Sequence, residues 1–420
     1  MSNQQLAVQF FLQLTVILLA CRLVGGLMRF VGQPRVMGEM IAGVLLGPSL
    51  LGFAAPGIQA ALFPPESLGV LAVVSQLGLV LYMFVVGTHL HTNFLQQAFR
   101  GALSISVAGT LVPFVLGAGL ALALQQDGRF FAPTVSPWQS MVYLGAAMSV
   151  TAFPVLARII HERGIAGTLL GTLALAAGAA SDVVAWCLLA VVLASFNNDP
   201  RIAVFAILGG GLYIAAVRYL VRPQLVKVAE AVEREGALGT GALGLIFVVV
   251  MAGAWFTDAI GVHAVFGAFV LGVAMPRGLV TKELARQVEP FAVTLLIPLF
   301  FVYSGLSTNI RLIGSAELFL VSLVVFAVAS VGKGVACWGA ALFAGRPNRE
   351  ALAIGALMNA RGLMELIILN IGLERGLITP TLFAVMVTMT IATTVAAGPL
   401  FDWAWKASGE VPDAPGVPVR

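Results

Sequence analysis

Long apolar runs recur along the whole chain, and they restrict its possible folds more than any other feature. The 420 residues are 60% hydrophobic and only 10% charged, a composition that would leave a water-soluble domain with an apolar surface. Each run has roughly 17–25 residues, which is enough to cross about 30 Å of hydrocarbon as a helix. The sequence therefore predicts an all-α polytopic membrane protein.

The predicted membrane-spanning helices number about thirteen. Their approximate ranges are 6–28, 36–53, 68–88, 101–123, 138–158, 168–195, 202–221, 238–257, 260–275, 291–307, 317–344, 352–373 and 378–402. We treat residues 1–407 as a single transmembrane unit and expect no appended soluble domain. Residues 408–420 form a short, Pro-rich tail that we expect to be disordered.

Basic residues concentrate in alternate loops, and this pattern predicts the orientation of the chain. The basic loops contain Arg29 and Arg35; Arg100; Arg158 and Arg163; Arg218, Arg222, Lys227 and Arg234; Arg277, Lys282 and Arg286; and Arg346 and Arg349. By the positive-inside rule these loops are cytoplasmic, so the N-terminus lies outside and the C-terminus inside. We expect the location to be a bacterial inner membrane. The net charge of +4 thus reflects topology, and nucleic-acid binding is not expected.

The sequence shows no pattern typical of a metal centre or an enzyme. The three cysteines, Cys21, Cys187 and Cys337, fall within predicted spans without metal-ligand spacing, and the four histidines are scattered. No constellation of nucleophile and base is evident. We expect no cofactor, no metal other than a transported monovalent cation, and no enzymatic activity.

Ionisable residues inside a membrane-spanning helix are costly and mark functional positions. Asp182 lies near the middle of the sixth predicted span without a basic residue three or four positions away, and Lys333 lies near the middle of the eleventh. We interpret Asp182 as the functional carboxylate and Lys333 as its counter-charge. In the twelfth span, Glu365 follows Arg361 by four residues, a spacing that favours an ion pair on one helix face. We assign that pair a structural role.

Two predicted spans are interrupted by helix-breaking residues. In the fifth, SVTAFPVLARII, Pro154 removes a backbone donor, and Ser149 and Thr151 supply oxygens beside the break. In the twelfth, ALMNARGLMELIILN, the interruption contains Asn359 and Gly362. If the seventh span is a linker, the two halves have opposite orientations and the interruptions occupy matching positions. This arrangement points to a transporter site near the membrane midplane.

The chain resembles the monovalent cation/proton antiporter superfamily, specifically its second branch, in four motifs: GAASDVVAWCLL, SVTAFPVLARII, IPLFFVYSGLSTNI and LMNARGLMELIILNIGL. That branch includes bacterial sodium/proton antiporters, potassium-efflux systems and plant cation/proton exchangers, and the plant exchanger-like members are the most similar. The resemblance covers essentially the whole transmembrane chain, with the motifs in the expected order.

The resemblance implies two inverted repeats whose discontinuous fifth and twelfth helices cross at their unwound centres, with Asp182 beside the crossing. It also implies a homodimer and alternating access of the elevator type. A core part, at about 96–201 and 308–407, would move against a dimerisation part, at about 1–95 and 202–307.

The predicted activity is secondary active antiport of a monovalent cation, sodium or potassium, against protons. Desolvation favours the protonated form of a carboxylate and a nearby cation favours its ionised form, so proton exchange can fall within a physiological pH range. A dehydrated cation also needs oxygen ligands. Asp182 would provide them together with Ser149, Thr151 and the backbone carbonyls near Phe153 and Ala360. If proton and cation cannot share the carboxylate, their movements are obligatorily coupled.

Ser181 stands where many electrogenic relatives carry a second acidic residue, directly before Asp182. We include Ser181 among the ion-binding residues and expect electroneutral, one-for-one exchange. A sodium-coupled organic-solute symporter and a cation channel on the same scaffold stay open as alternatives. A channel needs a continuous wet path, but the sequence shows no repeated carbonyl filter. A symporter for an organic anion would place more cationic or hydrogen-bonding groups at the crossing. The choice between sodium and potassium stays open.

Overall fold

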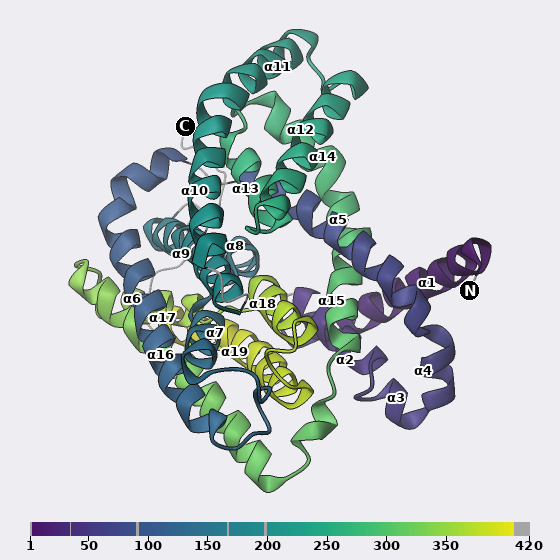
Figure 1. The fold of residues 1–420 in the computed structure, drawn as a ribbon. Coiled ribbons are helices and arrows are strands. Elements are labelled where there is room, and N and C mark those ends of the chain that lie inside the picture. The colour runs from purple at the N-terminus through teal and green to yellow at the C-terminus, as the bar shows by residue number, and fades with distance from the viewer. Residues whose placement is uncertain (1, 34, 90–91, 166–167, 197–199, 407–420) are drawn as a thin grey trace. The chain divides into compact units, whose positions relative to one another are not determined.

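The computed structural model describes residues 2–33, 35–89, 92–165, 168–196 and 200–406 (Figure 1). Within these ranges the chain is helical and forms no strand beyond one isolated bridge between Phe131 and Ile378. The predicted all-α class is therefore confirmed. The tail at 408–420, expected to be disordered, lies outside the described residues.

Contacts between helices divide the chain into two compact units. The first unit comprises Met1–Cys21, Ala54–His91 and Trp186–Tyr303, and the second comprises Arg22–Phe53, Thr92–Ala185 and Ser304–Arg420. Helices α1 (Asn3–Phe30), α9 (Leu169–Phe196) and α15 (Ile297–Leu306) contain residues of both units, as does α3 (Leu51–Ala54) through its last residue, Ala54. The assignment of a dimerisation part and a core part to the chain stays a prediction.

The first unit also contains helices α4 (Pro56–Leu62), α5 (Pro65–His89), α10 (Pro200–Ala216), η1 (Val217–Val221), α11 (Arg222–Glu235), α12 (Thr240–Ala259), α13 (Ala264–Ala274), α14 (Leu279–Phe291) and η2 (Ala292–Leu296). Helix α13 packs against both α5 and α12. The buried Tyr213 of α10 donates a hydrogen bond to the Gly267 carbonyl of α13 (2.8 Å), and its ring stacks on Phe256 of α12. A short α11, which follows a wide turn of π-helix, ends at Gly236 with φ of +72°.

The second unit contains helices α2 (Arg35–Leu46), α3 (Leu51–Ala54), α6 (Thr92–Gln125), α7 (Pro137–Ser149), α8 (Phe153–Glu162), η3 (Ile310–Ile313), α16 (Ala316–Phe343), α17 (Asn348–Met358), α18 (Leu363–Glu374) and α19 (Pro380–Lys406). Helix α6 packs against α7 and α16, and α17 packs against α16 and α19. Glycines permit the close approach of α6 and α7, because a Cβ atom at Gly145 would lie 2.8 Å from the Phe114 carbonyl oxygen. A capping box of Ser136 and Gln139 starts α7.

Eight helical segments of the described chain are long and apolar enough to cross a membrane, as judged by length and composition. They are Asn3–Phe30, Arg35–Ala54, Pro65–His89, Arg100–Gln125, Thr240–Ala259, Leu279–Leu306, Ala316–Phe343 and Pro380–Trp405. Two of the other predicted spans, 138–158 and 352–373, are each divided into two shorter helices. A total of thirteen spans stays a prediction.

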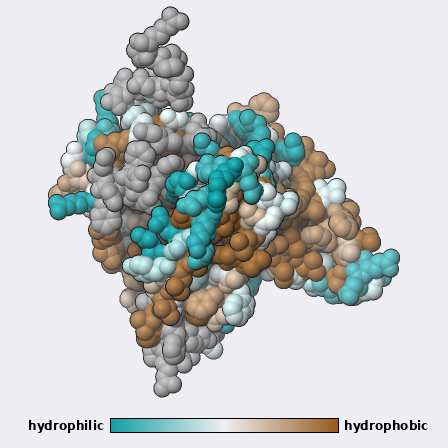
Figure 2. All heavy atoms as spheres, turned by 90° about the horizontal axis from the view of Figure 1, so that it is seen from above, coloured by the Kyte–Doolittle hydropathy of each residue, from teal (hydrophilic) through white to brown (hydrophobic). Residues whose placement is uncertain are grey.

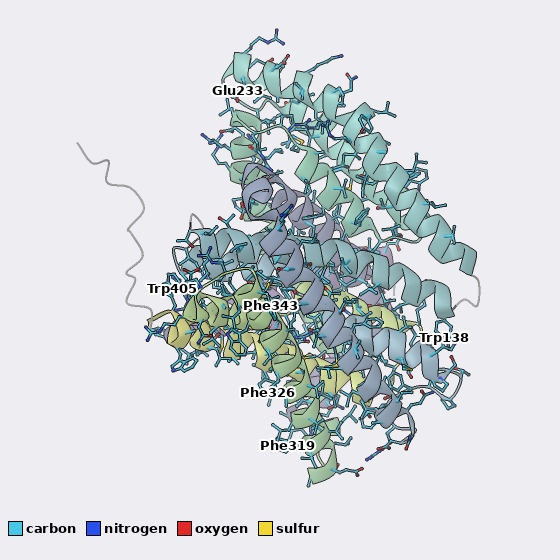
Figure 3. The ribbon with its side chains drawn as sticks, turned by 90° about the vertical axis from the view of Figure 1, so that its left-hand side faces the viewer. Trp138, Glu233, Phe319, Phe326, Phe343 and Trp405 are labelled. Atoms are coloured by element: carbon cyan, nitrogen blue, oxygen red, sulfur yellow. The ribbon has the colours of Figure 1, made fainter. Side chains whose placement is uncertain are left out.

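Apolar side chains remain exposed on these helices, as expected where lipid replaces water (Figure 2). Helix α16 illustrates the pattern, with Phe319 and Phe343 exposed near its two ends (Figure 3). Leu323, Val331 and Val335 are also exposed, whereas Lys333 of the same helix is 0% exposed. One face of α16 thus suits contact with lipid, while the face that carries Lys333 turns into the second unit.

Candidate functional site

Two interrupted helices of the second unit meet at their interruptions. The first gap, residues 150–152, separates α7 from α8, and the second gap, residues 359–362, separates α17 from α18. The Ala152 N–H donates a hydrogen bond to the Ala360 carbonyl, with an N···O distance of 3.1 Å. The bond thus pairs a backbone N–H of one gap with a backbone carbonyl of the other. Backbone groups that leave a helix inside a membrane need such partners, because no water is available there.

Gly362 ends the second gap in a conformation that suits glycine, with φ of +155°. A Cβ atom there would lie 3.1 Å from Val155 Cγ2 and 3.8 Å from Ala152 Cβ. The residue thus combines an unusual backbone conformation with tight packing against the first gap and α8.

We expect Gly362→Ala to lower the thermal stability of the detergent-solubilised protein, because the new methyl group meets both backbone strain and Val155. The cost is about 1–3 kcal/mol for a strained backbone position of this kind. Gly339→Ala is the matched control, since Gly339 lies in α16 with open space around its Cβ position. Equal melting temperatures for the two variants would contradict the expectation.

Asp182 is fully buried in the described part of α9. Neither carboxylate oxygen has a hydrogen-bond partner among the described residues, and the charge of Lys333 acts on the carboxylate. One turn earlier on the same face, Gly178 packs against α8, because a Cβ atom there would lie 2.7 Å from Leu156 Cδ2. Asp182 therefore lies beside the first turn of α8.

Two of the predicted oxygen ligands lie at the first gap: Ser149 is the last residue of α7, and Thr151 lies within the gap. Ser149 and Thr151 are both buried. The Ser149 hydroxyl donates to the Ala146 carbonyl (2.8 Å), and its own carbonyl accepts a hydrogen bond from the ammonium of Lys333. The Thr151 hydroxyl has no partner among the described residues. The gap thus offers one unpaired hydroxyl, and the end of α7 beside it offers a carbonyl that already binds the Lys333 ammonium.

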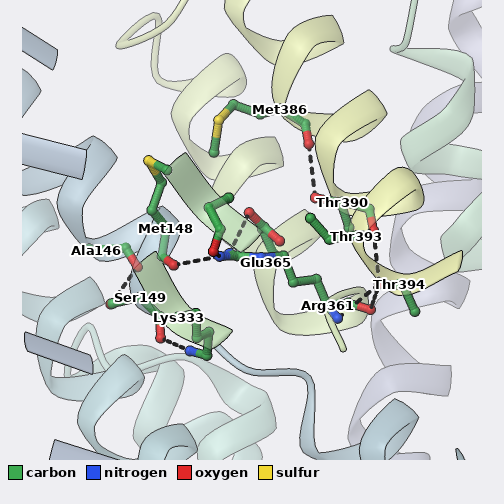
Figure 4. Close-up of polar contacts among 11 residues, drawn as sticks. Ala146, Met148, Ser149, Lys333, Arg361, Glu365, Met386, Thr390, Thr393 and Thr394 are labelled. Atoms are coloured by element: carbon green, nitrogen blue, oxygen red, sulfur yellow. Dashed lines mark hydrogen bonds and ion pairs between the residues drawn. The ribbon is translucent and has the colours of Figure 1, made fainter. Parts of the chain in front are cut away.

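Arg361 contacts four helices around the second gap (Figure 4). Its Nη1 lies 3.2 Å from Glu365 Oε1, and both residues are fully buried. Its Nη2 donates to the Met148 carbonyl at the end of α7 (2.8 Å) and reaches the Ala329 carbonyl of α16 (3.5 Å). The Arg361 backbone N–H donates to the Thr394 hydroxyl of α19 at 2.9 Å. The guanidinium therefore links the C-terminal end of α7 and the first turn of α18 to the middle of α16.

The charged side chains near the first gap lie at helix ends that carry the opposite partial charge. The C-terminal end of α7, where helix carbonyls carry partial negative charge, contacts two cations through the Ser149 and Met148 carbonyls. The N-terminal end of α8, which carries partial positive charge, lies beside the turn of α9 that precedes Asp182, since a Cβ atom at Gly178 would lie 3.5 Å from Phe153 Cδ2. Lys333, Arg361 and Asp182 thus each lie near a helix end of opposite partial charge.

The remaining predicted residues occupy several environments. Ser181 is buried, and its hydroxyl pairs with that of Ser106 on α6 at 3.1 Å. The Ala360 carbonyl accepts the bond from Ala152. Pro154 stands in the first turn of α8, but its side chain lies outside the described residues. The buried Asn359 ends α17 and donates to the Gly355 carbonyl at 3.2 Å.

Several contacts of the site were not foreseen from the sequence. Ser106 and Thr394 belong to helices without an interruption, and neither residue type is unusual in a membrane helix. The Met148 and Ala329 contacts use backbone carbonyls, which carry no signal in the sequence. Only the packing of segments that are distant in the sequence brings these groups to Ser181 and Arg361.

Comparisons with known proteins identify similar chains. A family model described as sodium/hydrogen exchanger, transmembrane, matches residues 15–407. The Na(+)/H(+) antiporter NhaS4 of Synechocystis sp. is 39% identical over 392 residues, which cover 92% of this chain and 94% of that protein. Cation/H(+) antiporter 17 of Arabidopsis thaliana is 39% identical over 395 residues, which cover 93% of this chain but 47% of that protein. This chain thus spans about half the length of the Arabidopsis relative.

A solved structure shares the fold. The sodium proton antiporter MjNhaP1 from Methanocaldococcus jannaschii superposes with a TM-score of 0.62, covering 95% of this chain and 98% of that one, at 14% sequence identity. The similarity in architecture therefore extends over nearly the full length of both chains.

Proposed function

Because the chain belongs to the sodium/hydrogen exchanger family, we propose that it is a secondary active antiporter that exchanges a monovalent cation, sodium or potassium, for protons. The relatives named as Na(+)/H(+) and cation/H(+) antiporters support this activity. The observation that carries the proposal is Asp182, a fully buried carboxylate whose two oxygens have no hydrogen-bond partner among the described residues. An unpaired carboxylate is costly in such a place, and a proton or a cation can each remove that cost.

In the proposed mechanism, Asp182 binds either a proton or a dehydrated cation. The Thr151 hydroxyl, which lacks a described partner, and the Ser149 hydroxyl would add oxygen ligands, together with the backbone carbonyls of Phe153 and Ala360. Lys333 would act as counter-charge to the empty carboxylate. Since one site cannot hold both ions, and only a loaded site would reorient, inward movement of one ion drives outward movement of the other.

We further propose the architecture that alternating access requires. About thirteen spans would form two inverted repeats, with α7–α8 and α17–α18 as the corresponding broken helices. The core part would move like an elevator against the dimerisation part of a homodimer. The N-terminus would lie outside and the C-terminus in the cytoplasm, with a bacterial inner membrane as the location. The direct bond between the two gaps supports the crossing of the broken helices.

Electroneutral exchange is proposed from the position before Asp182. Ser181 carries no charge, and its hydroxyl is engaged with Ser106 at 3.1 Å. One carboxylate beside the crossing favours one proton for each monovalent cation, so a full cycle would move no net charge.

Flux measurements in proteoliposomes test this proposal. We expect an imposed gradient of sodium or potassium to drive proton movement, which a pH-sensitive dye records, with lithium and rubidium included to rank the cations. An imposed membrane potential should leave the steady-state ion gradient unchanged, because the proposed cycle is electroneutral. Protein-free vesicles provide the control.

Each alternative predicts a different result. A voltage-dependent displacement of the reversal point would contradict one-for-one exchange. Passive current without coupled proton movement would identify a channel, and flux that requires an organic solute would identify a symporter. Either of these two results would overturn antiport.

A further inference from the structure

Asn359 at the second gap carries an unpaired oxygen. The side chain is only 5% exposed, and its Oδ1 has no hydrogen-bond partner among the described residues. Its Nδ2 donates to the Gly355 carbonyl at 3.2 Å. Burying an amide oxygen without a partner is unfavourable, so this atom requires an explanation.

The orientation of the amide follows from its neighbours. Reversing it would turn Oδ1 toward the Gly355 carbonyl and set two acceptors against each other, since a carbonyl can only accept. The nitrogen is also tightly packed against Gly334 of α16. A Cβ atom at Gly334 would lie only 2.7 Å from Asn359 Nδ2. The nitrogen is therefore anchored, and the oxygen is the free end of the amide.

The free oxygen belongs to a gap that is bonded directly to the other gap, where a second unpaired oxygen lies. Asn359 directly precedes Ala360, whose carbonyl bonds the Ala152 amide of the first gap. The residue before Ala152 is Thr151, whose hydroxyl also lacks a described partner, and Asp182 with two unpaired oxygens lies beside the first turn of α8. Two neutral oxygens and one carboxylate without described partners thus belong to the two gaps and the helix beside them.

We propose that Asn359 is a ligand of the transported monovalent cation, which it binds through Oδ1. Amide and carbonyl oxygens replace the hydration shell of sodium or potassium, whereas an amide oxygen does not bind a proton at physiological pH. Asn359 therefore sets the affinity and rank order for cations and leaves proton binding to the carboxylate. This inference rests on the proposed antiport, and it adds a ligand from the second gap.

The test is cation-dependent exchange by Asn359→Ala in proteoliposomes. We expect the apparent KM for sodium or potassium to rise on the order of tenfold, the effect of losing one polar contact to a charged group. The maximal rate at saturating cation should stay within about twofold, since the remaining ligands still assemble the site. The rank order of lithium, sodium, potassium and rubidium should change, and the pH dependence at saturating cation should not. A folded variant with unchanged KM and rank order would overturn the proposal.

Two further variants keep the result decisive. Asn359→Ser retains an oxygen on a shorter side chain, so it should raise the KM less than alanine does. If the alanine variant fails to fold, a serine variant with the parental KM and rank order would overturn the proposal, and one with a raised KM supports it. Asn370→Ala is the matched control, because Asn370 is a buried asparagine on α18, away from the second gap.

Failure of this inference is distinguishable from failure of antiport. Absence of cation-driven proton flux in the parental protein would overturn the proposed function. Normal parental exchange with an unaffected Asn359→Ala variant would overturn the assignment of Asn359 alone.

Discussion

Asp182→Asn is expected to reduce cation-driven proton flux in proteoliposomes to the level of protein-free vesicles. The amide keeps the shape of the carboxylate but carries no charge, so it can neither release a proton nor neutralise a dehydrated cation. The protein should remain folded, because both carboxylate oxygens lack hydrogen-bond partners in the described structure, and removing a buried charge removes a desolvation cost. Flux with a pH-sensitive dye and melting temperature in detergent are the two measurements.

The matched control is Asp258→Asn. Asp258 is exposed, and its Oδ1 accepts a hydrogen bond from the Ala264 backbone N–H (3.2 Å), which an asparagine oxygen can also do. This variant should exchange ions at the parental rate. Retained exchange in a folded Asp182→Asn protein would show that the site lies elsewhere.

Arg361→Ala is expected to cause a large loss of stability. The substitution leaves the fully buried Glu365 without its ionic partner and removes a donor from the Met148 carbonyl. Breaking one side of a buried ion pair costs roughly 3–5 kcal/mol. A markedly lower melting temperature in detergent should therefore be the main symptom, and any lost exchange should follow from the lost fold.

A double variant separates the lost charge pair from the lost packing. Arg361→Ala with Glu365→Gln should recover part of the stability, because position 365 then no longer carries an unpaired charge. Arg375→Ala, which removes an exposed arginine at the end of α18, should be nearly neutral. An Arg361→Ala protein of unchanged stability with an altered pH dependence of exchange would instead assign Arg361 to ion coupling.

The parts of the fold that could be predicted from the sequence depend on local chemistry. Apolar runs of spanning length predicted the all-α membrane class, and the motifs predicted the family that the comparisons confirm. The gaps lie where helix-breaking chemistry occurs, beside Pro154 and at Gly362. The four-residue spacing of Arg361 and Glu365 likewise corresponds to one turn of α-helix, so their proximity needs no knowledge of the tertiary structure.

The remaining features of the site depend on how distant segments pack. The hydroxyls of Ser106 and Ser181 are 75 residues apart in the sequence, and no local pattern relates them. The same holds for Arg361 and the Met148 carbonyl, which are 213 residues apart. The Asn359 amide packs against Gly334, a glycine on another helix. Contacts of these kinds become visible only when the helices are placed in three dimensions.

The bond between Ala152 and Ala360 has an implication for sequence divergence. Both partners are main-chain atoms, so exchanging either side chain does not remove the donor or the acceptor. Among the twenty amino acids only proline at 152 would delete the N–H. The connection between the two gaps can therefore persist while the side chains around it change, which would let cation preference evolve without loss of the scaffold.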